Sequence, residues 1–200
     1  AEEYLAVALA RRLGRPVKWI EERAENYVAT IHGRDVVTEL TFAATNDGRI
    51  TAVKGEMKCA MGAYLQLVTP GIPLLGAWIY SGPYDIPNYS VTFTGVFTNT
   101  TSTDAYRGAG RPEATYVLER TMDALARELG MDPVELRRKN FVEEFPHTMA
   151  SGLTIDSGDY DATLDRLLEL LDLDAIRAEQ ADRRARGDVK QIGVGFSTYN

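Results

Sequence analysis

The chain is poor in the residues that ligate metals directly. Its 200 residues include one cysteine, Cys59, and two histidines, His32 and His147. A single cysteine excludes an internal disulfide and cannot supply the four thiolates of an iron–sulfur cluster. The histidines lie far apart without the spacing of a zinc site, and we interpret both as structural or surface residues. We therefore predict that this chain's own side chains hold no metal.

Positive charge and long apolar runs are also lacking. The formal net charge is −7 at pH 7, which argues against nucleic acid as the main partner. No apolar run reaches the roughly 20 residues that span a bilayer, and the chain starts without a signal-like segment. We therefore expect no membrane span and a cytoplasmic location.

The two ends of the chain predict an internal segment. Position 1 is not methionine, and the helix expected from Glu2 has no capping residue before it. The last residues, from Gly193 to Tyr199, resemble a strand that stops partway. We expect residues 1–200 to belong to a longer protein, sheet-rich over 1–100 and built of a loop and helices over 101–190.

Hydrophobic periodicity predicts an α+β fold, with an antiparallel hairpin or sheet packed against helices. The Asn-Asp-Gly sequence at 46–48 lies between two alternating runs and predicts a hairpin turn. The apolar but proline- and glycine-broken stretch 60–84 predicts an irregular or briefly helical segment, either a pocket wall or an interface. The expected strands are 16–20, 35–44, 50–61 and 91–98, and the expected helices are 2–12, 112–129, 133–140, 160–171 and 175–186.

The glycine-rich stretch before the helix at 112–129 is the strongest functional signal. Gly108 and Gly110 can adopt positive φ, and Pro112 suits the first turn of a helix. Backbone N–H groups at a helix N-terminus, with Arg107 and Arg111 beside them, favour an anion. The alternative for a lone Gly-x-Gly is an ordinary turn with solvated arginines.

An ordered set of motifs gives the chain a family resemblance. Tyr-Asp-Ile-Pro-Asn stands at 84–88, Asn-Thr-Thr at 99–101, Ala-Tyr-Arg-Gly-Ala-Gly-Arg-Pro-Glu-Ala at 105–114, and a helical run follows at 122–140. In this order they resemble the molybdopterin-binding large subunit of the xanthine dehydrogenase and aerobic carbon monoxide dehydrogenase family. The resemblance implies an oxidoreductase that hydroxylates a substrate carbon with oxygen from water, or oxidises carbon monoxide. It also places the chain in a larger molybdopterin-binding domain.

The resemblance implies functional positions. It places at the molybdenum end of the cofactor Arg107, Gly108, Ala109 and Gly110, and at the substrate pocket Tyr106, Ala109 and Leu75. It places no catalytic residue in this segment, because the family's glutamate base would lie beyond Asn200.

Most charged residues around the loop are interpreted as structural or surface residues. We expect Arg111 either to reach the cofactor or to pair with Glu113. We interpret the carboxylates of Glu113, Glu119 and Asp104 as helix-start or surface charges.

The resemblance further implies cofactors and partners. The cofactor is molybdenum–molybdopterin, the cytosine dinucleotide being one of its forms. FAD and 2Fe-2S clusters would be carried by partner subunits or domains, in a dimer of heterotrimers acting on a small-molecule substrate.

Two departures narrow the implied chemistry. Copper-containing carbon monoxide dehydrogenases have a cysteine where this chain has Gly108, and purine-oxidising members have a phenylalanine where it has Ala109. We therefore expect an aldehyde or small heterocycle as substrate, as in the aldehyde oxidases. The alternative is a non-catalytic module that binds phosphate or a nucleotide with loop 107–112, although the P-loop lysine is missing.

Overall fold

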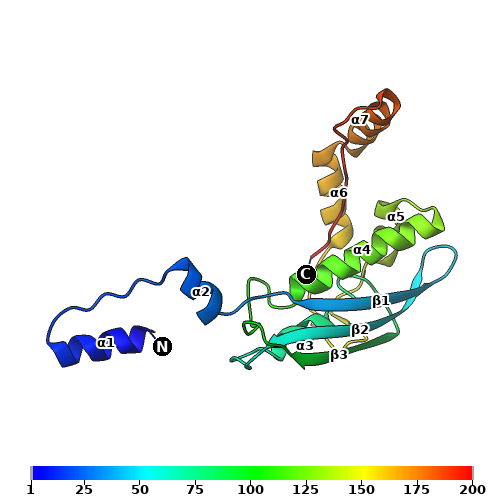
Figure 1. The fold of residues 1–200 in the computed structure, drawn as a ribbon. Coiled ribbons are helices and arrows are strands. Elements are labelled where there is room, and N and C mark those ends of the chain that lie inside the picture. The colour runs from blue at the N-terminus through cyan, green and yellow to red at the C-terminus, as the bar shows by residue number, and fades with distance from the viewer. Residues whose placement is uncertain (1, 200) are drawn as a thin grey trace.

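A three-stranded mixed sheet forms the centre of the computed structural model, which describes residues 2–199 (Figure 1). Its strands are β1 (Val36–Ala44), β2 (Ile50–Gly62) and β3 (Tyr89–Phe97), in the order β1-β2-β3. The predicted hairpin pairs β1 with β2 antiparallel, whereas β3 runs parallel to β2. A parallel pair needs a crossover connection, and residues 63–88 provide it.

The other elements surround this sheet. Strands β4 (His147–Thr148) and β5 (Thr154–Ile155) form a small separate sheet. The helices are α1 (Glu2–Leu13), α2 (Arg23–Ala29), α3 (Gly71–Trp78), α4 (Arg111–Leu129), α5 (Pro133–Asn140), α6 (Tyr160–Leu171) and α7 (Leu173–Arg186). Helix α4 packs on β1 and α5, and α3 packs on β3 and α4. The α+β prediction is confirmed, and the short α3 confirms the briefly helical segment.

The core lies between the sheet and α4. Alternation along β2 buries Val53, Met57 and Cys59 on the side toward α4, as the period of two predicts. Leu118 and Met122 project from α4 into the same core with no exposed surface. Each such fully buried aliphatic side chain contributes about 1.5–3 kcal/mol. This packing makes α4 a firm base for the loop that precedes it.

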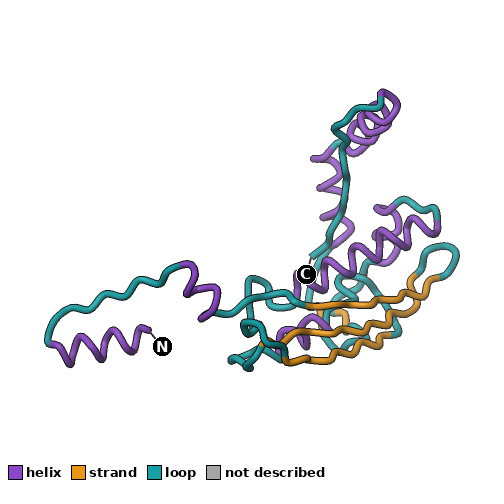
Figure 2. Tube along the Cα trace, in the orientation of Figure 1, coloured by secondary structure: helices purple, strands orange, loops and turns teal. Residues whose placement is uncertain are grey.

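Two parts of the chain extend away from the core. The N-terminal helices α1 and α2 bury no residue and form an arm beside the sheet, linked by an extended loop (Figure 2). On the other side, α6 and α7 project beyond α5 (Figure 1). Among residues 2–199, no helix is both long and apolar enough to cross a membrane.

Two predicted strands are wrong. Residues 16–20 are extended but lie in the exposed link between α1 and α2, where no neighbouring strand pairs with them. Residues 193–199 are extended as well, yet they run beside α4 and α6 instead of along a sheet edge. Alternating apolar residues specify an extended backbone, but a strand also needs a pairing partner.

Candidate functional site

The predicted glycine-rich loop is the turn that leads into α4. Helix α4 begins at Arg111, with Gly110 as its N-cap residue in the left-handed conformation and a proline in its first turn. The helix ends at the left-handed Gly130. The sequence-based prediction of a tight loop that feeds a helix N-terminus is therefore confirmed.

The loop backbone is unusual over four consecutive residues. The φ angles are 27° at Arg107, 104° at Gly108, 47° at Ala109 and 90° at Gly110. Glycine adopts such angles freely, but each of the two other residues costs about 1–3 kcal/mol. Strain of this size persists only where the surroundings impose it, and it is most often found at ligand-binding sites.

Lack of space for a Cβ atom explains both glycines. A Cβ atom on Gly108 would lie 2.7 Å from Cδ of Pro112, and one on Gly110 would lie 2.8 Å from the nitrogen of Gly76. The loop therefore sits directly against α3. Leu75, the neighbour of Gly76, is half-buried on that helix, so the structure brings this predicted pocket residue to the element beside the loop.

The loop leaves several backbone donors without an acceptor. Ala109 N–H donates to the Tyr106 carbonyl over 3.3 Å, and Arg111 N–H donates to the Gly108 carbonyl over 3.1 Å. Within residues 2–199, the N–H groups of Arg107, Gly108 and Gly110 have no hydrogen-bond acceptor. Successive N–H groups in such a turn, next to a helix N-terminus, form a concave anion-binding site.

Asp104 holds the start of this loop in place. Its carboxylate is buried and accepts hydrogen bonds from Val68 N–H over 3.1 Å and from the Thr69 hydroxyl over 3.2 Å. These bonds join the loop to the segment just before α3. The interpretation of Asp104 as a surface charge is wrong, because residues 68–69 fold back over its carboxylate. The sequence alone does not show this contact.

Glu119 is also buried, contrary to expectation. It is 4% exposed, and its carboxylate accepts from Arg137 Nε over 2.8 Å and from the Tyr84 hydroxyl over 2.8 Å. Burial raises the pKa of Glu119, and the Arg137 guanidinium opposes that shift. The pair joins α4 to α5 and to the segment after α3, so its role is to hold α4 in place.

Arg111 and Glu113 do not form the ion pair that was one of the two expectations for Arg111. In the part of the chain that the structure describes, no ion pair joins them, and Oε2 of Glu113 is buried without a hydrogen-bond partner. Arg111 is exposed and instead lines a cavity of about 450 Å³ with Met149, Ile155 and Tyr160. The interpretation of Glu113 as a helix-start residue is confirmed, since it lies in the first turn of α4.

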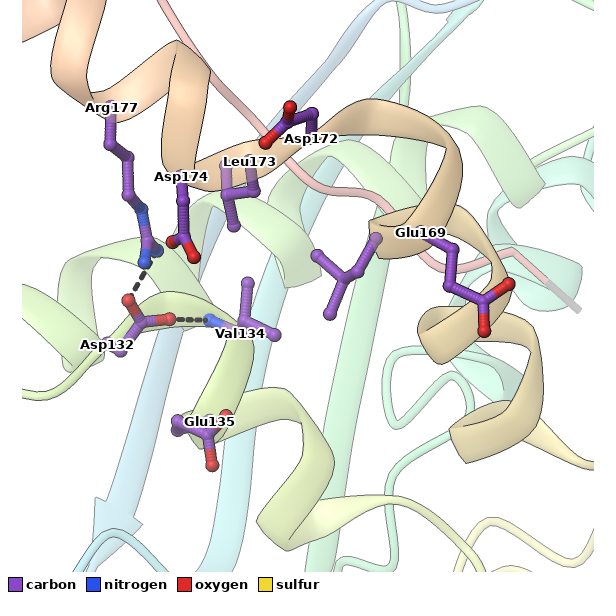
Figure 3. Close-up of a pocket in the computed structure, with 9 residues that line it drawn as sticks. Asp132, Val134, Glu135, Glu169, Asp172, Leu173, Asp174 and Arg177 are labelled. Carbon is purple, nitrogen blue, oxygen red and sulfur yellow. Dashed lines mark hydrogen bonds and ion pairs between the residues drawn. The ribbon is translucent and has the colours of Figure 1, made fainter.

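A cavity near the C-terminal helices is lined by carboxylates that have structural partners. It measures about 530 Å³ and lies between α5, α6 and α7 (Figure 3). Its carboxylates already stabilise helices: Asp132 accepts from Val134 N–H and pairs with Arg177, and Asp172 accepts from Ala175 N–H. These acids therefore serve as helix caps and ion-pair partners.

The structure brings most of the predicted residues together. Tyr106 and Arg107 are exposed, Ala109 is half-buried and Gly110 is buried against α3. Sequence reasoning missed Arg34, which contacts this loop from 72 residues away in sequence. The available signal was His-Gly-Arg-Asp at 32–35, a polar, glycine-containing stretch directly before a strand.

Comparisons with known proteins agree with this geometry. Residues 1–141 match the profile of the molybdopterin cofactor-binding domain. The carbon monoxide dehydrogenase large chain of Hydrogenophaga pseudoflava is 40% identical over 200 residues, which are 97% of this chain and 25% of that relative. The 6-hydroxypseudooxynicotine dehydrogenase complex subunit gamma of Paenarthrobacter nicotinovorans is 37% identical over 204 residues, 98% of this chain and 25% of that subunit.

A solved structure has the same fold. Quinoline 2-oxidoreductase from Pseudomonas putida 86 superposes with a TM-score of 0.83 at 37% identity, over 93% of this chain and 24% of that chain. The present chain thus spans about a quarter of the length of the curated relatives it matches.

Proposed function

Because the chain belongs to the molybdopterin cofactor-binding domain family, we propose that it forms part of a molybdenum-dependent hydroxylase or dehydrogenase and holds the cofactor with residues 106–110. The carrying observation is the run of positive φ angles that leaves three backbone N–H groups free beside the N-terminus of α4. The donor set suits a metal held by its own pterin, because the loop offers hydrogen-bond donors and no thiolate or imidazole.

Each loop residue has its own role in this proposal. The N–H groups of Gly108 and Gly110 donate to anionic groups at the molybdenum end of the cofactor, and the Arg107 guanidinium adds fixed donors. Ala109 faces the substrate, with Tyr106 and Leu75 as further walls of the pocket. When bound, the cofactor supplies the two-electron oxidation. The catalytic base comes from elsewhere in the protein.

We propose an aldehyde or a small heterocycle as the substrate. Gly108 offers no thiolate for a copper ion, and the only cysteine, Cys59, is buried in β2. Ala109 offers no aromatic ring for stacking a purine. A heterocycle also gives its name to quinoline 2-oxidoreductase, the structural neighbour with 37% identity.

We also propose partners and cofactors beyond this chain. Electrons would pass to 2Fe-2S clusters and FAD on partner subunits or domains, with the complex forming a dimer of heterotrimers. The relative described as a complex subunit gamma supports a multi-subunit assembly. The cytosine dinucleotide form of the cofactor and the cytoplasmic location stay predictions.

The deciding experiment replaces Arg107 by alanine in the full-length parent enzyme. We expect Arg107→Ala to lower molybdenum content or turnover about 10²-fold, since that is the typical cost of one preorganised donor. Elemental mass spectrometry and steady-state kinetics measure the two quantities. Arg186→Ala on α7, where the side chain pairs with Asp188, is the matched control and should leave both unchanged.

Two outcomes would contradict the proposal. Equal effects of the two arginine substitutions would remove the loop from the cofactor site. An active parent without molybdenum would replace the proposal by the phosphate-binding alternative, and calorimetric titration with a nucleotide would then show binding that Arg107→Ala abolishes.

A further inference from the structure

Arg34 contacts the loop from outside, directly before β1. Its Nη2 donates to the carbonyl of Tyr106 over 3.0 Å and also to the carbonyl of Arg107. The guanidinium carbon lies 5.1 Å from the centre of the Tyr106 ring. One side chain therefore fixes two successive carbonyls and stacks on an aromatic ring of the same loop.

The peptide plane transmits this contact to the other side of the loop. Within one planar trans peptide, the carbonyl and the N–H of the next residue point in opposite directions. Fixing the carbonyls of Tyr106 and Arg107 on Arg34 therefore turns the N–H groups of Arg107 and Gly108 away from Arg34. These two N–H groups are among those that have no acceptor within residues 2–199.

The surroundings hold Arg34 in place for this contact. His32 N–H donates to the Ser102 carbonyl over 3.0 Å, and Asp104 N–H donates to the His32 carbonyl over 3.0 Å. A Cβ on Gly33 would lie 3.0 Å from Cβ of Tyr106, so the two segments are in close contact. Arg34 itself has a φ of 66°, an angle that a non-glycine residue adopts only under constraint.

We infer that Arg34 is a positioning residue, which sets the direction of the Arg107 and Gly108 N–H groups through its bonds to the Tyr106 and Arg107 carbonyls. The identity of the group that these N–H donors meet rests on the proposed function. The contact of Arg34 with these two carbonyls, called the clamp below, involves residues of this chain alone.

The test uses Arg34→Asn and Arg34→Lys in the full-length parent enzyme. Asparagine tolerates positive φ better than most residues, so the first variant removes the guanidinium without adding backbone strain. Lysine keeps the positive charge over the ring but lacks the planar fork. Arg186→Ala serves as the control.

The first readout is hydrogen exchange of the peptide covering residues 105–111 in the cofactor-free enzyme. The Ala109 N–H, bonded to the Tyr106 carbonyl, reports on loop order without any activity measurement. We expect exchange about tenfold faster in Arg34→Asn and a smaller increase in Arg34→Lys, because charged hydrogen bonds order the loop. Unchanged exchange in Arg34→Asn would overturn the clamp.

The second readout is molybdenum content with kcat and KM of the loaded enzyme. We expect Arg34→Asn to lower molybdenum content or kcat about tenfold with little change in KM, and Arg34→Lys to recover part of the loss. Faster exchange with normal molybdenum content and kcat would overturn the positioning role. The exchange readout does not depend on the Arg107→Ala result, so failure of the proposed function and failure of the Arg34 contact are separable.

Discussion

Helix α4 carries polar groups of two kinds, one at its N-terminus and one at its middle. In the middle, Glu119 and Arg137 are 4% and 0% exposed and are bonded to each other. Arg137 also donates to the Pro133 carbonyl over 3.0 Å, to Asp123 over 2.9 Å and to the Phe196 carbonyl over 3.1 Å. At the N-terminus, the N–H groups of Gly108 and Gly110 have no acceptor among residues 2–199.

The polar groups in the middle of α4 have partners and stabilise the fold, whereas those at its N-terminus lack partners in the described part of the chain and can bind a ligand. A buried charge without a partner costs several kcal/mol, so the network around Arg137 must be complete for α4 to pack. Gly108 is exposed, so its N–H carries no such penalty and is free to meet a ligand. The complete network therefore keeps the helix in place while the incomplete loop offers its donors.

The largest effect is expected where the network is broken. Replacing Arg137 by alanine leaves the carboxylate of Glu119 buried without its cation, which should destabilise the protein by about 3–5 kcal/mol. Thermal unfolding of the parent enzyme measures the change. Arg107→Ala at the exposed loop is the comparison variant and should change stability by less than about 0.5 kcal/mol.

A double variant sharpens this prediction. Replacing Glu119 and Arg137 together by glutamine and methionine removes both buried charges, and such replacements are often nearly neutral. Recovery of most of the stability lost in Arg137→Ala would confirm that the unpaired charge causes the loss. An Arg137→Ala protein as stable as Arg107→Ala would erase the distinction between the two regions.

An intermediate effect is expected at the contact between the loop and α3. Gly110→Ala combines a φ of 90° with a Cβ 2.8 Å from the nitrogen of Gly76, and overpacking of this kind costs about 1–3 kcal/mol. Gly187→Ala is the control, because Gly187 has a φ of 70° and no atom within 4 Å of the added Cβ. It should cost only the about 1 kcal/mol of the left-handed backbone.

The measurement again uses unfolding of the parent enzyme, with molybdenum content beside it. Gly110→Ala should lose cofactor as well as stability, whereas Gly187→Ala should retain the cofactor. Equal losses of stability in the two variants would mean that the backbone angle alone matters and that α3 does not restrict the loop.

Local signals explain what the sequence predicted correctly. The periods of α4 and β2, the Asp-Gly turn and the glycines at 108 and 110 act within a few residues, so the hairpin, the helix and the loop were all predictable. Pairing partners are not local. Residues 16–20, which form no strand, show that an apolar, alternating pattern does not specify a pairing partner.

Burial of charge was unpredictable for the same reason. Glu119 pairs with a residue 18 positions away, and Asp104 bonds to a segment 36 positions before it. Arg34 reaches the loop across 72 positions. The crossover between β2 and β3, the packing of α4 and the contact of residues 32–34 with residues 102–106 bring these residues together, and none of them is encoded in a short motif.

The smallest expected effect is the pH dependence of stability that comes from the buried residue Cys59. Burial raises the pKa of the Cys59 thiol to about 11, and nearby Glu113 acts in the same direction. A free thiol has a pKa of about 8.5, so the unfolded chain loses this proton first. The contribution of Cys59 to stability is therefore complete below about pH 8.5 and is lost as pH rises toward 11.

Urea unfolding of the parent enzyme at pH 8 and at pH 9.5 measures this contribution against Cys59→Ala. Wild type should lose about 1 kcal/mol more than the variant over that interval, since one pKa unit corresponds to about 1.4 kcal/mol. Arg107→Ala, at the exposed loop, should retain the wild-type pH dependence. If it instead behaves like Cys59→Ala, the loop is coupled to the buried face of β2, and the loop and the core beneath α4 respond to pH as one unit.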